Sequence, residues 1–194
     1  MRRGYGREAY LELVGGRGPR ADLQLSSDFI SGFCGETEED HRATLDLLEQ
    51  VGYSQAFMYA YSLRERTRAA YRLEDDVPRA TKLRRLQEVI DCFHRTAAAG
   101  NRRELGRTHL VLVEGPAKRG EGLLTGRTDT NKRVVFAGER PGEAAAGGAR
   151  GGQGGARSPP PPCLLRPGDY AAVRIEAATG HTLRGAALGR ASNA

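Results

Sequence analysis

The chain has 194 residues, enough for one ordinary domain or two small ones, and 39% of them are hydrophobic. Its net charge of +6 favours an acidic partner such as RNA, although a solvated Arg-rich surface would give the same charge. No apolar run approaches the roughly 18 residues of a membrane span, and we recognise no targeting segment. The three cysteines, Cys34, Cys92 and Cys163, are far apart, which argues against a disulfide framework and a self-contained metal site.

The first half of the chain has the pattern of an α/β fold. We expect a short helix at 7–14, and then a strand at 23–30 with little polar alternation, as in a parallel strand covered on both faces. Thr37 is a good N-cap for a helix that ends at Gly52, and a second buried strand follows at 56–61. Strand, helix and strand in this order predict a βαβ unit with parallel strands.

The second half begins after a charged loop and an amphipathic helix, whose apolar stripe is Leu83, Leu86, Ile90 and Phe93. From residue 105 onward, five short strand-like runs are separated by Gly-rich turns, which is typical of a small antiparallel barrel. A Gly- and Pro-rich tract at 138–167 interrupts these runs. This tract cannot bury a core, so we expect a long disordered insertion in one barrel loop.

Several motifs occur in an order and spacing that can be compared with a known family. They are MRRGY at 1–5, SSDFISGFCGETEED at 26–40, AYSLRERTRAA at 60–70 and DDVPRATKLRRLQEVI at 75–90. Together they resemble the C-terminal half of the radical S-adenosylmethionine barrel of the MiaB-type tRNA methylthiotransferases. The runs LVLVEGPAKR, LTGRTDTNKRVVF and GDYAAVRIEAATGHTLRGAAL resemble the TRAM domain that closes those enzymes. The sequence RERT at 64–67, where bacterial members tend to have Gly before Thr, is closer to the eukaryotic organellar branch.

The resemblance implies an α/β part followed by an all-β part. Residues 1–76 would form a partial parallel (βα) radical-SAM barrel, and 77–103 would form a linker helix. Residues 104–191 would form a five-stranded antiparallel TRAM barrel that contains the insertion 138–167.

The resemblance also implies an activity, the 2-methylthiolation of N6-isopentenyladenosine in tRNA, with S-adenosylmethionine and [4Fe-4S] clusters as cofactors. Neither set of cluster-binding cysteines of the family is in this chain, and Cys34, Cys92 and Cys163 lie in three unrelated elements. We therefore expect a truncated enzyme that is inactive alone, and the sequence assigns no catalytic or metal-binding residue.

Cofactor contacts are implied at the carboxyl ends of the two strands, where parallel sheets bind ligands. The apolar residue of the motif would touch the adenine, nearby polar groups would meet the ribose, and the arginine would reach the cofactor or the tRNA. The alternatives are core packing, a tight turn and a plain surface charge. The candidates are Ser27, Asp28, Ile30, Gly32, Ala60, Tyr61 and Arg64.

Basic residues of the amphipathic helix and the barrel are candidates for one RNA-binding surface, because small barrels of this type commonly present a face to RNA. Phe136 and Tyr170 look like core residues, so we expect contacts to the RNA backbone rather than base stacking. The RNA-binding candidates are Arg84, Arg85, Arg102, Arg103, Lys118, Arg119, Arg127, Lys132 and Arg133.

Two other interpretations stay open. The chain could be a non-catalytic module that binds RNA, or that binds the full-length enzyme or a regulatory protein. It could also be an unstable gene product, because half a barrel exposes the edge of its first strand. We expect tRNA as the partner, no membrane association, a monomer, and a mitochondrial or cytoplasmic location.

Overall fold

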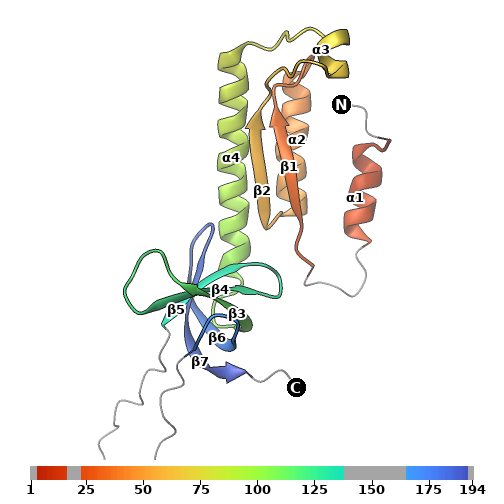
Figure 1. The fold of residues 1–194 in the computed structure, drawn as a ribbon. Helices are drawn as coiled ribbons and strands as arrows, with labels where there is room; N and C mark the ends of the chain where they lie inside the picture. Colours follow the sequence, from red (N-terminus) through yellow and green to blue (C-terminus); the bar gives the residue numbers. More distant parts are fainter. Residues whose placement is uncertain (1–3, 17–22, 138–164, 192–194) are drawn as a thin grey trace, which may run out of the picture. The chain divides into compact units, whose positions relative to one another are not determined.

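The computed structural model describes residues 4–16, 23–137 and 165–191, and the chain divides into two compact units, Met1–Gly100 and Asn101–Ala194 (Figure 1). The predicted insertion 138–167 lies outside the described residues except for its last three positions. Among the described residues, none of the helices combines the length and the hydropathy that crossing a membrane requires.

The first unit contains a parallel two-stranded sheet of β1 (Ser26–Ser31) and β2 (Gln55–Ala60). The two strands are in register from Ser26 beside Gln55 to Ser31 beside Ala60, so they end at the same edge. The helix between them is α2 (Glu38–Val51), which confirms the predicted βαβ order. The other helices are α1 (Arg7–Gly15), α3 (Arg68–Arg72) and α4 (Arg79–Arg102).

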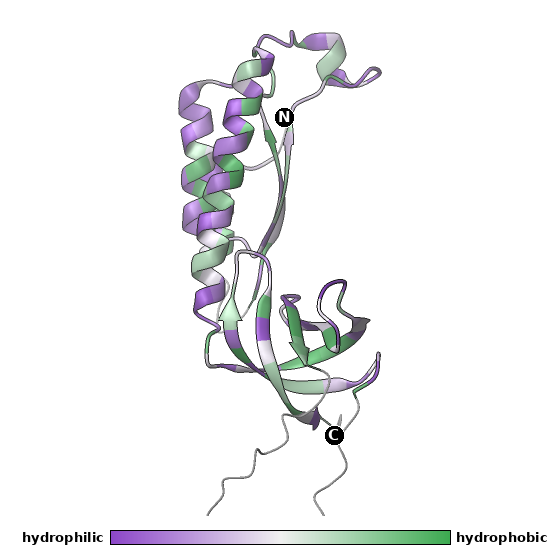
Figure 2. Ribbon diagram, turned by 90° about the vertical axis from the view of Figure 1, so that its left-hand side faces the viewer, coloured by the Kyte–Doolittle hydropathy of each residue, from purple (hydrophilic) through white to green (hydrophobic). Residues whose placement is uncertain are grey.

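One face of this sheet forms the core of the first unit. Helices α2 and α4 lie side by side on that face (Figure 2). The buried core residues are Phe29, Leu48, Val51, Tyr53, Val89, Cys92, Phe93 and Ala97. The buried face of α4 carries Val89, Cys92, Phe93 and Ala97, at the three- and four-residue spacing of one helical face. Of the predicted stripe only Phe93 is buried, and Leu83 is 50% exposed.

The opposite face of the sheet is open in the part of the chain that the structure describes. Ile30, Phe57 and Tyr59 are 38%, 53% and 55% exposed. The prediction of strands covered on both faces is therefore wrong for the described residues. The apolar run did not distinguish a strand with two cover layers from a strand with one.

The turn between β1 and α2 is held by local hydrogen bonds. The Thr37 hydroxyl accepts from the Asp40 N–H at 3.2 Å, and the Asp40 carboxylate accepts from the Thr37 N–H at 3.0 Å. This reciprocal pair satisfies two N–H groups that the first helical turn leaves free. Gly52 ends α2 in the left-handed conformation. Both predicted boundaries of α2 are confirmed.

The second unit is a closed five-stranded barrel with the strand order β3-β4-β5-β7-β6. Its strands are β3 (Thr108–Pro116), β4 (Leu123–Thr128), β5 (Arg133–Ala137), β6 (Tyr170–Ala178) and β7 (Leu183–Ala191). All neighbouring pairs are antiparallel except β5 and β7, which are parallel. The prediction of a wholly antiparallel barrel is thus wrong for one pair, β5 with β7.

Inward-facing residues fill the barrel because successive side chains of a strand alternate between its faces. Phe136 is 1% exposed at the centre of this core, as predicted, whereas Tyr170 is only partly buried. The strands approach closely at Gly185, where an added Cβ would lie 2.2 Å from the Arg174 carbonyl oxygen.

Gly185→Ala should destabilise the barrel by about 1–3 kcal/mol, because the added methyl group would meet backbone rather than a movable side chain. Urea unfolding followed by circular dichroism measures this loss. The matched control is Gly100→Ala, in the last turns of α4, where an added Cβ has open space. Equal stability of the two variants would show that the close approach at Gly185 is not tight in solution.

Candidate functional site

A hollow of about 300 Å³ lies at the carboxyl end of β1 and β2. Its lining comes from Ile30 of β1 and from the end of β2 with the segment after it: Tyr59, Ala60, Tyr61, Ser62 and Arg64. The structure thus brings together four of the seven predicted cofactor residues, namely Ile30, Ala60, Tyr61 and Arg64. The parallel register causes this, because Ile30 lies directly beside Tyr59 on the open face of the sheet.

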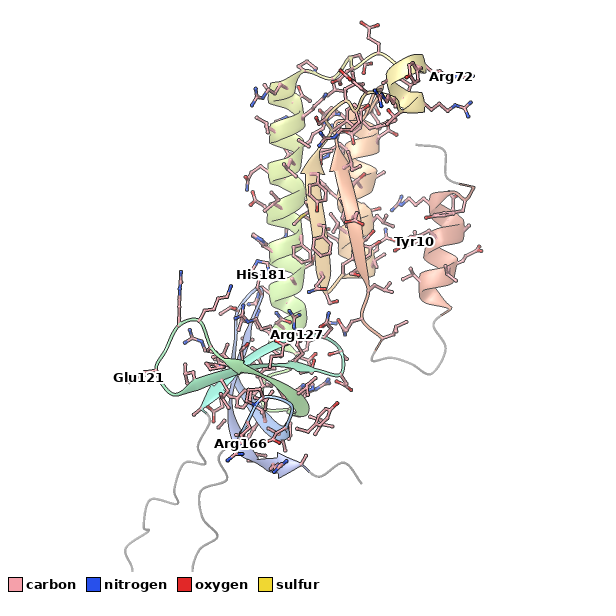
Figure 3. The ribbon with its side chains drawn as sticks, in the orientation of Figure 1. Tyr10, Arg72, Glu121, Arg127, Arg166 and His181 are labelled. Carbon is pink, nitrogen blue, oxygen red and sulfur yellow. The ribbon has the colours of Figure 1, made fainter. Side chains whose placement is uncertain are left out.

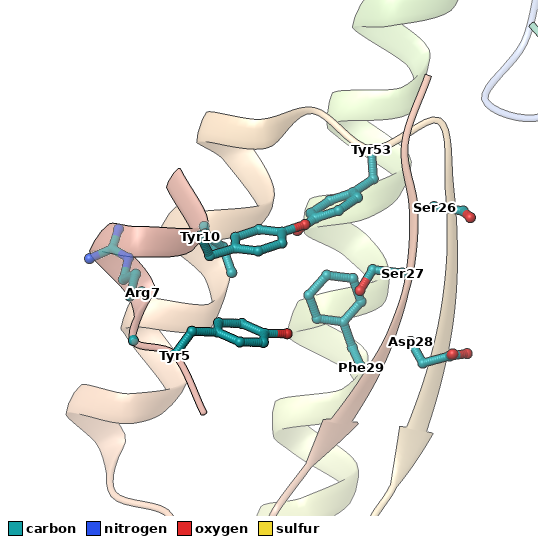
Figure 4. A pocket seen from close by; sticks show the side chains of 10 residues that line it. Tyr5, Arg7, Tyr10, Ser26, Ser27, Asp28, Phe29 and Tyr53 are labelled. Atoms are coloured by element: carbon teal, nitrogen blue, oxygen red, sulfur yellow. The ribbon is translucent and has the colours of Figure 1, made fainter. Parts of the chain in front are cut away.

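Ser27 and Asp28 do not line this hollow. They belong to a second one of about 480 Å³, whose lining includes Tyr5, Tyr10 and Tyr53 (Figure 4). There the Tyr10 and Tyr53 hydroxyls are 2.7 Å apart. Successive side chains of a strand point to opposite faces. Ser27 therefore lies on the same face as the buried Phe29, while Asp28 points the other way (Figure 4).

Gly32 serves the turn after β1 and does not line the hollow. Its φ angle of 77° is in the left-handed region, and an added Cβ would lie 2.3 Å from Cγ of Lys82. Its N–H donates to the Glu36 carboxylate at 2.6 Å. Gly32 is therefore needed for the turn and for the passage of the Lys82 side chain.

Lys82 of α4 and the ring of Phe33 hold Tyr61, which lines the strand-end hollow. Lys82 is 6% exposed and forms an ion pair with Asp75. Its Nζ lies 5.1 Å from the centre of the Tyr61 ring, and Phe33 meets the same ring edge-on at 5.0 Å. Burial, followed by the neighbouring Cys34 thiol, raises the pKa of Tyr61. These contacts fix the Tyr61 ring at the end of β2.

Arg85 of α4 ties the β1–α2 turn to the helix. It is 4% exposed, and its Nη1 donates to the Glu36 carboxylate at 2.8 Å and to the Glu36 carbonyl at 2.9 Å. Its Nη2 donates to the Glu38 carboxylate at 2.9 Å. The hydrogen bond from Arg85 is the main reason that the pKa of Glu38 lies below its ordinary value. The same Glu36 carboxylate holds the Gly32 N–H.

Arg84 belongs to the same charged network. It pairs with Glu38 of α2 and with Glu88 one turn further along α4. Glu88 also contacts Nε2 of the buried His41 at 2.6 Å. Hydrogen bonds from His41 and then Arg84 lower the pKa of Glu88. Carboxylates of the first unit occupy both guanidinium groups, so phosphate binding by Arg84 and Arg85 stays a prediction.

Lys132 of the barrel is also engaged internally. Its Nζ donates to Glu104 at 2.9 Å and to Asn101 at 3.1 Å, and its side chain is only 10% exposed. Burial alone would raise the pKa of Glu104, but the hydrogen bond and the charge of Lys132 outweigh it, so this pKa is lowered. Lys132 is therefore largely buried in an internal ion pair, and its assignment as a phosphate ligand stays a prediction.

Arg127 and Arg133 face each other across β4 and β5 in the ladder register. Nε of Arg127 lies 3.5 Å from the Glu114 carboxylate, and Nε of Arg133 donates to the Thr125 hydroxyl at 3.3 Å. Like charges directly opposite one another on a sheet repel. We call Arg127, Arg133 and Arg184 the barrel arginine row.

Arg184 is a residue that the sequence reasoning missed. It is exposed, and it lies beside Val135 in the parallel pairing of β5 and β7, diagonal to Arg133. The alternation in the run TLRGAAL could have placed it on the outer face. Among the remaining candidates, Arg103, Lys118 and Arg119 are exposed and have no ion pair within the described ranges, while Arg102 takes part in another interaction.

The described residues contain no group of His, Cys, Asp and Glu that could hold a metal ion. Cys34 lies in the β1–α2 turn, and Cys92 is buried in the core, where burial raises its pKa. Cys163 lies outside the described residues.

The first three strands of the barrel, β3 to β5, lie in the part of the chain that a known domain family matches. The match is to the TRAM domain and covers residues 102–146. The chain contains a TRAM domain. This agrees with the domain that the sequence motifs of the barrel resemble.

Similar proteins extend the match over nearly the whole chain. Over 98% of its length the chain is 47% identical to the mitochondrial tRNA methylthiotransferase CDK5RAP1 of Homo sapiens. Over 97% of its length it is 44% identical to the tRNA-2-methylthio-N(6)-dimethylallyladenosine synthase of Chlorobium luteolum. It spans 30% and 37% of these two relatives. The resemblance to the C-terminal part of the MiaB-type tRNA methylthiotransferases is thereby confirmed.

Arg85→Ala should lower the free energy of unfolding by about 3–5 kcal/mol, because it leaves the carboxylates of Glu36 and Glu38 without their buried partner. Urea unfolding at neutral pH measures the loss. The control is the adjacent Arg84→Ala, whose side chain is 47% exposed and whose effect should be much smaller, because solvent screens an exposed ion pair. Similar losses in both variants would contradict the structural role of Arg85.

Glu104→Gln should destabilise the barrel at neutral pH, and the difference from the unmodified chain should shrink as the pH falls below the ordinary Glu value of 4.5. A carboxyl group with a lowered folded-state pKa stabilises the fold above its unfolded pKa, and this contribution is lost on acidification through the folded pKa. Thermal melts across this pH range test the prediction. Glu121→Gln, in the exposed turn after β3 (Figure 3), is the control. A difference in melting temperature between Glu104→Gln and the unmodified chain that stays constant across this pH range would contradict the prediction.

Proposed function

We propose that this chain supplies the tRNA-binding barrel and part of the S-adenosylmethionine site of a tRNA methylthiotransferase. The observation that carries the RNA part is the barrel arginine row, since arginines that repel each other on one outer face are relieved by phosphate. The names of the relatives support tRNA as the RNA class and a mitochondrial location.

The strand-end hollow fits the adenosine part of the cofactor. Ile30 offers an apolar side chain to a base, and the backbone at 60–61 offers polar groups beside it. Arg64, at the same hollow, would meet the carboxylate of the cofactor or a phosphate of the RNA. Asp28 lies on the same open face as Ile30 and suits the ribose, whereas Ser27 lies on the other face. When bound, the cofactor would supply the radical that begins methylthiolation.

The described residues do not fit an iron–sulfur cluster. A cluster needs several thiolates that converge, and Cys34 and Cys92 lie in separate elements of the first unit, one in a turn and one in the core. We therefore derive no step through a cluster. The chemistry assigned to this chain is the binding and orientation of the cofactor and the tRNA.

A second candidate function is supported by the open face of the sheet. Phe57 and Tyr59 are more than half exposed beside Ile30, which is typical of a surface that meets another protein surface. The chain would then be a module that binds the full-length enzyme or a regulatory protein. Size-exclusion chromatography with each partner distinguishes this function from RNA binding by an isolated monomer.

A tRNA titration at increasing salt tests the proposed function. The double variant Arg127→Gln, Arg133→Gln should bind more weakly, and the slope of log affinity against log salt should fall by about 1.4–1.8, because two phosphate contacts are lost. The control is Arg42→Gln, an exposed arginine of α2. Equal affinity and slope in the double variant and the unmodified chain would refute the barrel as the binding surface.

A further inference from the structure

The segment between β2 and α4 contains four arginines, and the strand-end hollow accounts for only the first of them, Arg64. We call residues 64–72 the arginine turn. Its four arginines are Arg64, Arg66, Arg68 and Arg72, and all four are exposed. Within the described residues, none of these guanidinium groups has a hydrogen bond or an ion pair, and the side chain of Arg72 projects from α3 (Figure 3).

The arginine turn has a defined backbone. The Thr67 hydroxyl donates to the Arg64 carbonyl at 2.8 Å and accepts from the Ala70 N–H at 3.3 Å. At the end of α3, the Leu73 N–H donates to the Ala69 carbonyl at 2.9 Å. These bonds fix the backbone turn from which Arg64, Arg66 and Arg68 extend.

Acidic residues next to the arginine turn are used elsewhere. Asp75 pairs with the buried Lys82, and Asp76 accepts from the Gly35 N–H at 2.8 Å. Glu65 lies within the turn and Glu74 lies just after it, and both are exposed. The turn itself therefore carries four positive charges against one negative charge. This excess favours an anionic partner.

Arg66 gives an independent sign of a ligand-binding role. Its φ angle of 63° lies in the left-handed region, which costs energy for a residue with a side chain and none for glycine. No described contact of its side chain offsets this cost. Strained positions of this kind gather at sites where a side chain is needed for function.

Tyr71 adds an aromatic surface to these charges. It is 74% exposed on α3, three residues after Arg68 and directly before Arg72. Exposed rings beside arginines are the platforms on which proteins stack unpaired bases. Arg64 at the other end of the turn also lines the strand-end hollow.

We propose that the arginine turn is a second RNA-binding element, which contacts the phosphates of a single-stranded loop and stacks one unpaired base on Tyr71. The proposal rests on the proposed function in taking RNA as the partner. It differs in placing a contact on the first unit and in expecting base stacking. The barrel arginine row would hold the RNA backbone independently of this element.

The test measures the binding of two RNA probes by the full chain: a stem–loop with an unpaired loop, and a fully paired duplex. Tyr71→Ala should weaken stem–loop binding about fivefold or more and leave duplex binding unchanged, whereas Tyr71→Phe should bind both probes like the unmodified chain. The control is Tyr5→Ala, because Tyr5 is 58% exposed on the same unit. Unchanged stem–loop binding by Tyr71→Ala would overturn the stacking contact.

Arg66→Gly separates function from folding. The melting temperature should stay the same or rise, because glycine accepts the left-handed backbone, while stem–loop binding should weaken and its salt dependence should decrease. Unchanged binding would overturn the role of Arg66. If only the double variant Arg127→Gln, Arg133→Gln weakens stem–loop binding, the RNA-binding role of the arginine turn is refuted and the proposed barrel function stands. If only Tyr71→Ala and Arg66→Gly weaken stem–loop binding, the proposed barrel function is refuted and the role of the arginine turn stands.

Discussion

The arrangement of the first unit depends on the pairing of buried Arg85 with Glu36 and Glu38. One guanidinium group holds the carboxylates on either side of the N-cap, and the Glu36 carboxylate in turn holds the Gly32 N–H. Removing a charged partner from such a group costs several times more than losing an exposed pair. The carboxyl end of β1, and with it one wall of the strand-end hollow, is thereby attached to α4.

This constraint produces two kinds of surface on a small sheet. The face toward α2 and α4 is closed by apolar packing, while the opposite face leaves Ile30, Phe57 and Tyr59 exposed. The strand-end hollow lies on the open face, and the arginine turn continues from it. In the barrel, the corresponding separation is between an apolar interior and an outer face with arginines. Both units therefore carry arginines on surfaces that take no part in the packing of their apolar cores.

Much of the fold followed from local patterns in the chain. Thr37 and Gly52 specify the two ends of α2 by short-range chemistry, and these predictions were confirmed. The predicted apolar stripe of α4 was wrong in part, since Leu83 is 50% exposed while Val89, Cys92 and Phe93 are buried. The cofactor candidates at the end of β2 came together because parallel strands share an edge. Arg85 and Lys132 could not be assigned from sequence, since a buried and an exposed cation look alike until the carboxylates that surround them are located.

The sequence by itself determined the order of helices and strands, the two-part organisation and the resemblance to the MiaB-type enzymes, because periodicity, capping residues and motifs are encoded within short stretches. Only the tertiary structure decided which cations are free, which face of the sheet is open, and that β5 pairs in parallel with β7. Those properties depend on contacts between residues far apart in the chain. Arg66 shows the difference, because its charge is known from the sequence, whereas its left-handed backbone is a property of the folded turn.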